Sequence, residues 1–165
     1  MERMWAPWRM AYINNISNTP PQEGCIFCSA WKENDDRERL VLTRSGHSLI
    51  MLNRYPYSGG HLMVAPSRHV SDMDDLSDTE ILDLMQCVRR AHNLLKAACS
   101  PHGFNMGINL GKAGGAGIED HMHVHIVPRW NGDTNFMSVV GDVRVIPEGL
   151  QETYDRLAEK IKAGA

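Results

Sequence analysis

The sequence predicts an α+β fold in which an antiparallel sheet of about five strands is combined with two helices. Short apolar runs with strand-like alternation follow one another across turns of a few residues, as is typical of antiparallel strands. After the third run, a segment with helical spacing begins at a capping motif. A second amphipathic segment lies near the C-terminus. These observations indicate strands linked mostly by short turns, with helices inserted between them.

The first three strands are expected at residues 40–43, 47–53 and 61–65. Ser45-Gly46 forms a turn between the first two, and Gly59-Gly60 interrupts the chain before the third. All three segments are therefore predicted to be separate strands.

A long helix follows the third strand. Ser77 and Glu80 form a capping box at its start, and Pro101 with Gly103 ends it near Cys99. Its predicted apolar face consists of Ile81, Leu84, Met85, Val88, Ala91 and Leu95.

The C-terminal half supplies the remaining elements. Strands are expected at residues 104–110 and 121–127, a further short strand at 137–146, and a helix from 147 to about 162. Leu150, Tyr154, Leu157 and Ile161 share one face of this last helix.

The 165 residues are expected to form one domain, with an N-terminal extension over 1–24, a core over 25–130 and a C-terminal strand and helix over 131–165. The formal net charge of -3 does not favour a nucleic-acid partner. The sequence contains neither an apolar run of about 18 residues nor a signal-peptide pattern. We therefore expect a cytoplasmic protein without a membrane partner.

Three histidines with a spacing of two, His121, His123 and His125, are the main functional candidates. On a strand this spacing places the imidazoles on one face, with the intervening Met122, Val124 and Ile126 directed to a core. The outer two lie about 13 Å apart at Cα, which is too far for all three to hold one metal easily. The three histidines are therefore expected to have different tasks.

A glycine-rich loop at 111–117, which includes Lys112, directly precedes the histidines. Its backbone N–H groups and the Lys112 cation suit an anion, although it lacks the pattern of a P-loop. A neutral histidine beside a phosphate can attack phosphorus and form a phosphoramidate. His123, in the middle, is best placed to attack, while His125 can hold the attacking ring or donate to the phosphate.

Cys25 and Cys28 form a Cys-x-x-Cys motif. Such a motif provides half of a tetrahedral zinc site, which two histidines would complete. A redox role requires the first cysteine at a helix start within a thioredoxin-like unit, a context not evident in the sequence. Zinc is therefore favoured, although spacing does not identify the two histidines. Cys87 and Cys99 are predicted to be small buried hydrophobic residues.

The run from His121 to Val127 resembles the signature of the histidine triad (HIT) superfamily of nucleotide hydrolases and transferases. Residues 52–70 resemble the ribose-binding strand and turn of that family, and Asn109 with its glycine loop also corresponds. Residues 4–10 and 128–136 are similar to segments of the bacterial diadenosine tetraphosphate phosphorylases.

The resemblance implies an HIT-like fold and a catalytic triad of His121, His123 and His125, in which His123 is the nucleophile. His125 would support both the phosphate and His123, and Asn53 would meet the ribose hydroxyls. The α-phosphate would be held by the loop and its neighbours, namely Asn109, Lys112, Gly115, Ala116 and Gly117.

In members with the two-cysteine motif, the resemblance implies a structural zinc ion held here by Cys25, Cys28, His69 and His121. One departure concerns the loop: many relatives have a serine shortly before the triad that contacts the phosphate, whereas this chain has Gly117 and Ile118. Backbone N–H groups or Lys112 are the candidates to replace that hydroxyl.

The resemblance implies phosphorolysis of diadenosine tetraphosphate to ATP and ADP, with inorganic phosphate as the acceptor. Hydrolysis of adenylyl amides or dinucleotides to AMP by the same residues is an alternative. A third hypothesis is a zinc-stabilised nucleotide-binding module without catalysis. The family also implies a homodimer, which the apolar N-terminal segment and the final helix would serve.

Overall fold

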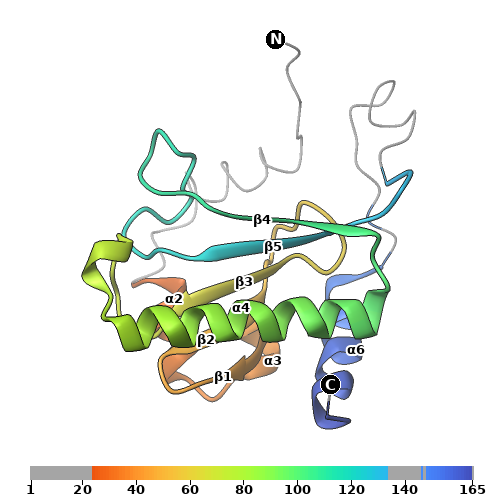
Figure 1. Cartoon of the computed structure of the whole chain (residues 1–165). Helices are drawn as coiled ribbons and strands as arrows, with labels where there is room; N and C mark the ends of the chain where they lie inside the picture. The colour runs from red at the N-terminus through yellow and green to blue at the C-terminus, as the bar shows by residue number, and fades with distance from the viewer. Residues whose placement is uncertain (1–23, 134–145, 147, 165) are drawn as a thin grey trace.

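The computed structural model describes residues 24–133, 146 and 148–164, and in this part the chain forms one antiparallel sheet with helices packed against it (Figure 1). The order of the strands in the sheet is β1-β2-β3-β5-β4. The predicted α+β class with five antiparallel strands is confirmed. The strands are β1 (Val41–Arg44), β2 (Ser48–Leu52), β3 (Leu62–Pro66), β4 (Gly103–Ile108) and β5 (Val124–Arg129).

The strand order places β5 inside the sheet, between β3 and β4. Leu62 faces Ile126 and Met63 faces His125 across the β3–β5 pair, while Met106 faces Ile126 across the β4–β5 hairpin. Side chains alternate along each strand, so Met63 and His125 lie on one face and Leu62 and Ile126 on the other. The histidine segment thus runs through the middle of the domain.

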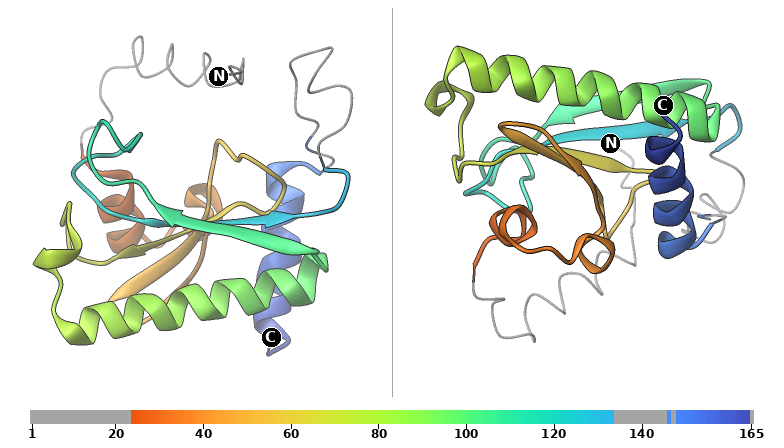
Figure 2. Two further views of the ribbon diagram at one scale, coloured as in Figure 1. Left: turned by 45° about the horizontal axis from the view of Figure 1, so that its top comes forward. Right: turned by 90° about the horizontal axis from the view of Figure 1, so that it is seen from below.

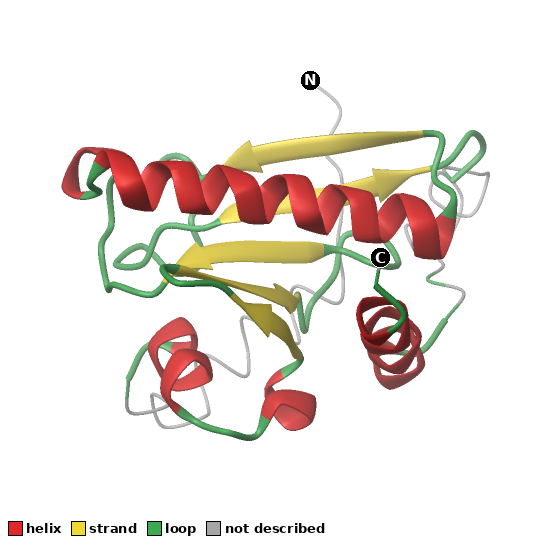
Figure 3. Cartoon of the chain, turned by 60° about the horizontal axis from the view of Figure 1, so that its bottom comes forward, coloured by secondary structure: helices red, strands yellow, loops and turns green. Residues whose placement is uncertain are grey.

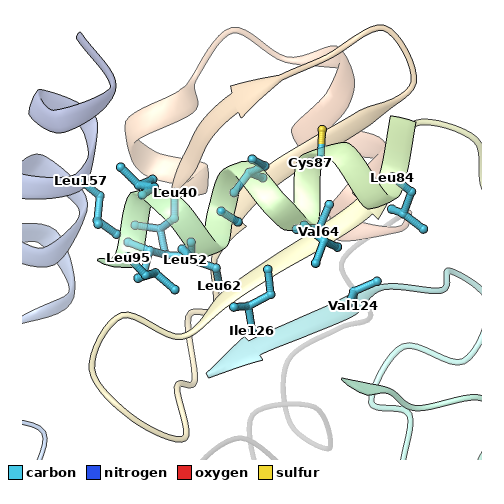
Figure 4. Close-up of a cluster of buried hydrophobic side chains, with 14 of the residues drawn as sticks. Leu40, Leu52, Leu62, Val64, Leu84, Cys87, Leu95, Val124, Ile126 and Leu157 are labelled. Carbon is cyan, nitrogen blue, oxygen red and sulfur yellow. The ribbon is translucent and has the colours of Figure 1, made fainter. Parts of the chain in front are cut away.

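One face of the sheet is covered by the long helix α4 (Asp78–Cys99), as Figures 1 and 3 show. The capping box between Ser77 and Glu80 is present at its start, as predicted. Leu84, Cys87 and Leu95 of α4 pack with apolar residues of β2, β3 and β5 in the main core (Figure 4). The predicted face was wrong at Met85, which is 55% exposed, because the buried stripe continues through Cys87 and Leu94 instead.

The C-terminal helix α6 (Leu150–Lys162) packs across the end of α4 and against β1 (Figure 2). Its predicted apolar face is used inside the domain: Tyr154 and Leu157 are buried, and Leu150 and Ile161 pack beside them. The Tyr154 hydroxyl donates a hydrogen bond to the backbone carbonyl of Val41 at 3.0 Å. Tyr154 and Leu157 of this face therefore pack inside the domain.

The opposite face of the sheet has a second, smaller core under the short helix α2 (Ile26–Lys32), and a second short helix, α3 (Asp36–Arg39), contacts β1. The sequence did not predict them, since four to seven residues are too few to show a helical period. A 3-10 turn, η1 (Met73–Asp75), precedes α4. The second core contains Phe27, Ala30, Val41, Leu49, Met51, Met63 and Ala65.

Some expectations fall outside the described residues, namely the strand at 137–146 except for residue 146, and the N-terminal segment before residue 24. No helix in the described part is long and apolar enough to cross a membrane. All four cysteines have free thiols, and Cys87 is buried as predicted, whereas Cys99 is only half-buried and accepts a hydrogen bond from Arg156 at 3.1 Å.

Tyr154→Phe tests the docking of α6. The change leaves the buried Val41 carbonyl without its donor, so we expect the free energy of unfolding to fall by about 1 kcal/mol. Urea unfolding at neutral pH measures it. Leu157→Ala, which opens a cavity at the same interface, serves as the reference and should cost about 2–5 kcal/mol. An unchanged midpoint in Tyr154→Phe would show that this hydrogen bond does not stabilise the docking.

Candidate active site and metal centre

The three triad histidines lie on the face of the sheet opposite α4. Only His125 belongs to β5, which begins at Val124, so the predicted strand starts three residues later than expected. Met122, Val124 and Ile126 are in the main core, as the alternation predicts. The imidazoles are not an exposed row: His121 is 0% and His123 is 4% exposed, and His125 is half-buried.

The rings are close to one another and to one phenylalanine. The ring centroids of His123 and His125 are 4.7 Å apart. The Phe27 ring, which belongs to α2, lies 5.0 Å from the His121 ring and 4.9 Å from the His123 ring. Phe27 is fully buried.

A fourth histidine, His61, joins the group at the start of β3. Its Nε2 atom lies 2.9 Å from Nδ1 of His125. Its position in the sequence predicts no function for it. In the alternation of β3, His61 has the same parity as Met63, which faces His125 across the strand pair. That signal becomes visible only once β3 is known to pair with β5.

The hydrogen bonds around His61 determine which nitrogens carry protons. Nδ1 of His61 accepts a hydrogen bond from the backbone N–H of Tyr57 at 3.1 Å. A neutral imidazole has one donor and one acceptor, so Nε2 of His61 carries the proton and donates to Nδ1 of His125. Nε2 of His125 therefore carries a proton that it can donate to a ligand.

The same reasoning applies to His123 and His121. Nδ1 of His123 donates to the backbone carbonyl of His121 at 3.0 Å, which leaves Nε2 with its lone pair. Nε2 of His121 donates to the Pro66 carbonyl at 2.9 Å, which leaves its Nδ1 with a lone pair. His123 is thus prepared as a nucleophile and His121 as a metal ligand.

Burial keeps these rings neutral. Burial, together with a smaller effect of the neighbouring histidines, lowers the pKa of His61 to about 3 and that of His125 to about 4. Burial also lowers the pKa of His123 below its usual value. A charged imidazole loses its hydration in such a site, so the neutral tautomers described above persist at neutral pH.

Four potential metal ligands, Cys25, Cys28, His69 and His121, converge beside the triad, and their ligand atoms all lie within 4.8 Å of one another. Nδ1 of His121 is 3.2 Å from Sγ of Cys25 and 3.7 Å from Sγ of Cys28. Nδ1 of His69 is 3.4 Å from Sγ of Cys28.

These separations fit a tetrahedral ion. Zinc bonds of about 2.3 Å to sulfur and 2.0–2.1 Å to nitrogen place neighbouring S and N ligands about 3.6 Å apart. The bond from Nε2 of His121 to Pro66 supplies the outer hydrogen bond typical of a metal-bound histidine. Burial and the adjacent Cys25 thiol raise the pKa of Cys28, which favours the neutral thiol, whereas a bound cation would favour the thiolate.

One feature expected of a redox cysteine pair is present in the structure, although it was not evident in the sequence. Cys25 is the N-cap of α2, so a cysteine does stand at a helix start. The surrounding unit is still not thioredoxin-like, because the described sheet is antiparallel throughout and two histidines approach the cysteines. The geometry of the cluster therefore favours metal ligation over disulfide exchange.

Asn53 lies directly after β2, next to the histidine group. Its Oδ1 accepts from the backbone N–H of Tyr55 at 2.9 Å, and its Nδ2 lies 3.3 Å from Nδ1 of His61. The bond from Tyr55 orients the amide, and its Nδ2 group keeps an N–H to donate to a ligand.

The glycine loop lies between β4 and β5 and is largely exposed. The N–H groups of Gly115 and Ala116 donate within the loop to Lys112 and Gly111, and Asn109 donates to the Gly115 carbonyl at 3.5 Å. Two of the N–H groups expected to meet a phosphate are therefore already used. Within the described part of the chain, the N–H of Gly117 has no protein acceptor, and the exposed side chain of Lys112 has no hydrogen bond or ion pair.

The family model of the HIT domain matches residues 34–132 of this chain. An AP-4-A phosphorylase of Mycobacterium tuberculosis is 40% identical over 166 residues, which covers 96% of this chain and 83% of that protein. An adenosine 5'-monophosphoramidase of Schizosaccharomyces pombe is 29% identical and covers 84% of this chain and 98% of that protein.

Solved structures have the same fold. A hypothetical histidine triad nucleotide-binding protein of Sulfolobus tokodaii has a TM-score of 0.66 and 26% identity, covering 84% of this chain and 93% of that one. A zinc-bound histidine triad family protein of Mycobacterium smegmatis has a TM-score of 0.66 and 23% identity, covering 86% and 98%. With the family model matching more than half of its length, the chain belongs to the HIT family.

Proposed function

We propose that this protein is a nucleotidyl transferase that cleaves diadenosine tetraphosphate with inorganic phosphate to give ATP and ADP. The observation that supports it most is the buried His123 ring, whose Nδ1–H is held by a backbone carbonyl so that Nε2 keeps a lone pair for attack. The similarity to an AP-4-A phosphorylase favours this substrate and acceptor.

In the first step, Nε2 of His123 attacks the α-phosphorus of the dinucleotide. The P–N bond forms as the P–O bond to the departing ATP breaks, which leaves an adenylyl-histidine. In the second step, an oxygen of inorganic phosphate attacks the same phosphorus, the P–N bond breaks and ADP leaves. His123 thereby returns to its starting tautomer, because its Nδ1–H stays bonded to the His121 carbonyl throughout.

His125 would stabilise the charge that develops on phosphorus. Its Nε2–H is free to donate to a phosphate oxygen because His61 occupies its Nδ1. His61 acts through His125 and is thus a positioning residue. Without a loop serine, we also assign stabilisation of the leaving group to His125, whose Nε2–H can donate a hydrogen bond to the oxygen of the departing ATP, which leaves as an anion.

Nucleotide binding is assigned to the residues around the triad. Asn53 would donate its remaining N–H to a ribose hydroxyl. The loop would contact the α-phosphate through the Gly117 N–H and, after adjustment of its internal hydrogen bonds, through Gly115 and Ala116. Asn109 holds the loop and Lys112 would add a cation. His121 would not touch the phosphate, because both of its ring nitrogens are engaged inside the protein.

Hydrolysis is the alternative function, with water in place of phosphate in the second step. The similarity to an adenosine 5'-monophosphoramidase favours it, because the same histidines would release AMP from an adenylyl amide. The two reactions share the adenylyl-histidine and differ in the acceptor and, for an adenylyl amide, also in the leaving group.

We assign a structural zinc ion to Cys25, Cys28, His69 and His121, a proposal supported by the fit of their separations to a tetrahedral site. Zinc would neutralise the two thiolates and hold the chain around them, away from the reacting phosphorus. Ligating thiols require a reducing environment, in accord with a cytoplasmic location.

A homodimer is part of the proposal. Leu82 and Met85 on the outer side of α4 are 59% and 55% exposed, and Met106 on the edge strand β4 is 45% exposed. These apolar side chains, rather than the buried face of α6, would meet the second subunit.

Product analysis tests the function. Zinc-loaded protein is incubated with diadenosine tetraphosphate with and without inorganic phosphate, and the products are separated by ion-exchange chromatography. We expect ATP and ADP only when phosphate is present, and a fall in rate of about a thousandfold or more in His123→Asn. ATP and AMP in both mixtures would replace phosphorolysis by hydrolysis, and turnover that survives His123→Asn would refute the nucleophile.

Acid should destabilise the fold through the buried histidines. Because the pKa of His61 is about 3 in the folded protein and near 6.5 when unfolded, the unfolded chain binds more protons between these values. The contribution of His61 to the free energy of unfolding is fully present above pH 6.5. It is lost as the pH falls toward 3, at up to about 1.4 kcal/mol per pH unit. Urea unfolding at several pH values between 7 and 5 measures the free energy of unfolding at each pH. We expect this free energy to change less with pH in His61→Phe than in the wild type. Equal slopes would mean that His61 is not kept neutral by burial.

Removal of one thiol tests the metal centre. Cys25→Ser should lose stoichiometric zinc and also lower the unfolding midpoint, because the folded state is stabilised by a metal that the unfolded chain binds poorly. Metal is measured by elemental analysis after dialysis, with Cys87→Ala, a buried thiol outside the cluster, as the control. Zinc retained at one ion per chain in Cys25→Ser would refute the ligand assignment.

A further inference from the structure

Phe27 lies between the two cysteines of the metal cluster in sequence, and in space its ring lies against two histidines with different tasks. The centroid of its ring is 5.0 Å from that of the metal ligand His121 and 4.9 Å from that of the nucleophile His123. Phe27 is fully buried and belongs to the second core. The peptide segment that carries the thiols thus also places an aromatic wall beside the attacking ring.

His121 also connects the metal cluster to the nucleophile His123. Its Nδ1 belongs to the metal cluster, its Nε2 donates to Pro66, and its carbonyl accepts the hydrogen bond that fixes the tautomer of His123. A shift of His121 would therefore move the acceptor on which the Nε2 lone pair of His123 depends.

The anchoring of α2 is uneven between its two ends. Near its C-terminus, Arg44 donates to the carbonyls of Ala30 at 2.6 Å and of Glu33 at 3.2 Å. At its N-terminus, the N-cap Cys25 makes no side-chain capping bond, and the helix has only seven residues. So short a helix is unstable by itself, so the position of its first turn depends on what its side chains contact. Those contacts are the metal cluster, through Cys25 and Cys28, and the second core, through Ile26 and Phe27.

We propose that Phe27 and the His121 carbonyl link the metal cluster to the nucleophile, so that metal binding holds the His123 ring in the orientation and tautomer required for attack. Phe27 is a positioning residue in this account, and it acts by restricting rotation of the His123 ring. The inference rests on the proposed function in one respect, because it takes His123 as the attacking group.

The expected consequence is a loss of rate without a loss of binding. A His123 ring that is free to rotate away from its acceptor spends less time with Nε2 directed at phosphorus. Because the attack depends on orientation, such misplacement lowers its rate. Nucleotide affinity does not depend on that rotation. A residue that only fills the core would instead change stability and leave the state of the His123 ring unaltered.

The experiment compares zinc-loaded wild type, Phe27→Leu and Leu49→Val. Phe27→Leu keeps all four metal ligands and an apolar side chain but removes the ring. Leu49→Val is the matched control, because Leu49 is a fully buried member of the same core that the site does not use. Long-range proton–nitrogen NMR spectra of the histidine rings, recorded at one pH, report the tautomer of His123. Rapid-quench kinetics report adenylyl-histidine formation, and equilibrium titration with AMP reports binding.

We expect wild type and Leu49→Val to show a single Nδ1-protonated tautomer of His123, and Phe27→Leu to show a mixture. Adenylyl-histidine formation should slow by about tenfold or more in Phe27→Leu, with AMP affinity within about twofold of the wild type. Wild type freed of zinc by a chelator should show the same mixed tautomer. Circular dichroism checks that it stays folded, and Phe27→Leu tests the link independently of that result.

A single tautomer in Phe27→Leu, with a rate equal to that of Leu49→Val, would overturn the inference, as would an unchanged His123 signal in folded zinc-free protein. The result is distinguishable from failure of the proposed function. A wild type that forms no adenylyl-histidine, while its His123 signal still responds to zinc and to Phe27→Leu, would refute the function and support the link.

Discussion

Strands β3 and β5 pair through Leu62 with Ile126, Met63 with His125 and Val64 with Val124, and this antiparallel pairing holds both halves of the site. At one end it brings His61 beside His125, and beyond the other end it brings the Pro66 carbonyl within hydrogen-bonding distance of His121. A register shift of one residue would move every one of these side chains to the wrong face. The proposed catalytic donor and the proposed metal ligand therefore depend on the same ladder.

Burial has a chemical effect beyond stability in this site. Neutral imidazoles can be ordered by backbone groups because each has one donor and one acceptor, and the described structure uses the Tyr57 N–H and the carbonyls of His121 and Pro66 for this purpose. Protonation would remove the acceptors from the network. The low pKa values of His61 and His125, caused first by burial, thus preserve a set of tautomers in which one ring presents a lone pair and its neighbour presents a proton.

The glycine loop before the triad contributes less to the proposed chemistry than the histidines do. Two of its glycines are required by the backbone: a Cβ on Gly114 would overlap the Leu110 carbonyl oxygen, and Gly115 has a φ of +83°. The resulting turn uses some of its own N–H groups internally. Without a serine in the loop, the proposed chemistry relies on the Nε2–H of His125 as the hydrogen-bond donor to the leaving oxygen, which connects catalysis more closely to His61 and hence to β3.

The sequence by itself determined the elements with a clear period or capping motif, including the strands, α4 with Ser77 and Glu80, and the alternation of Met122, Val124 and Ile126 with the histidines. It also singled out Cys25 and Cys28. These features are local, so residue order is enough to reveal them. It missed α2 and α3, which are too short for a period, and the role of His61. Only the tertiary structure decided which nitrogens face which partners, because the contacts of His61 with His125 and of His121 with Pro66 and the cysteines join residues 55 to 96 positions apart.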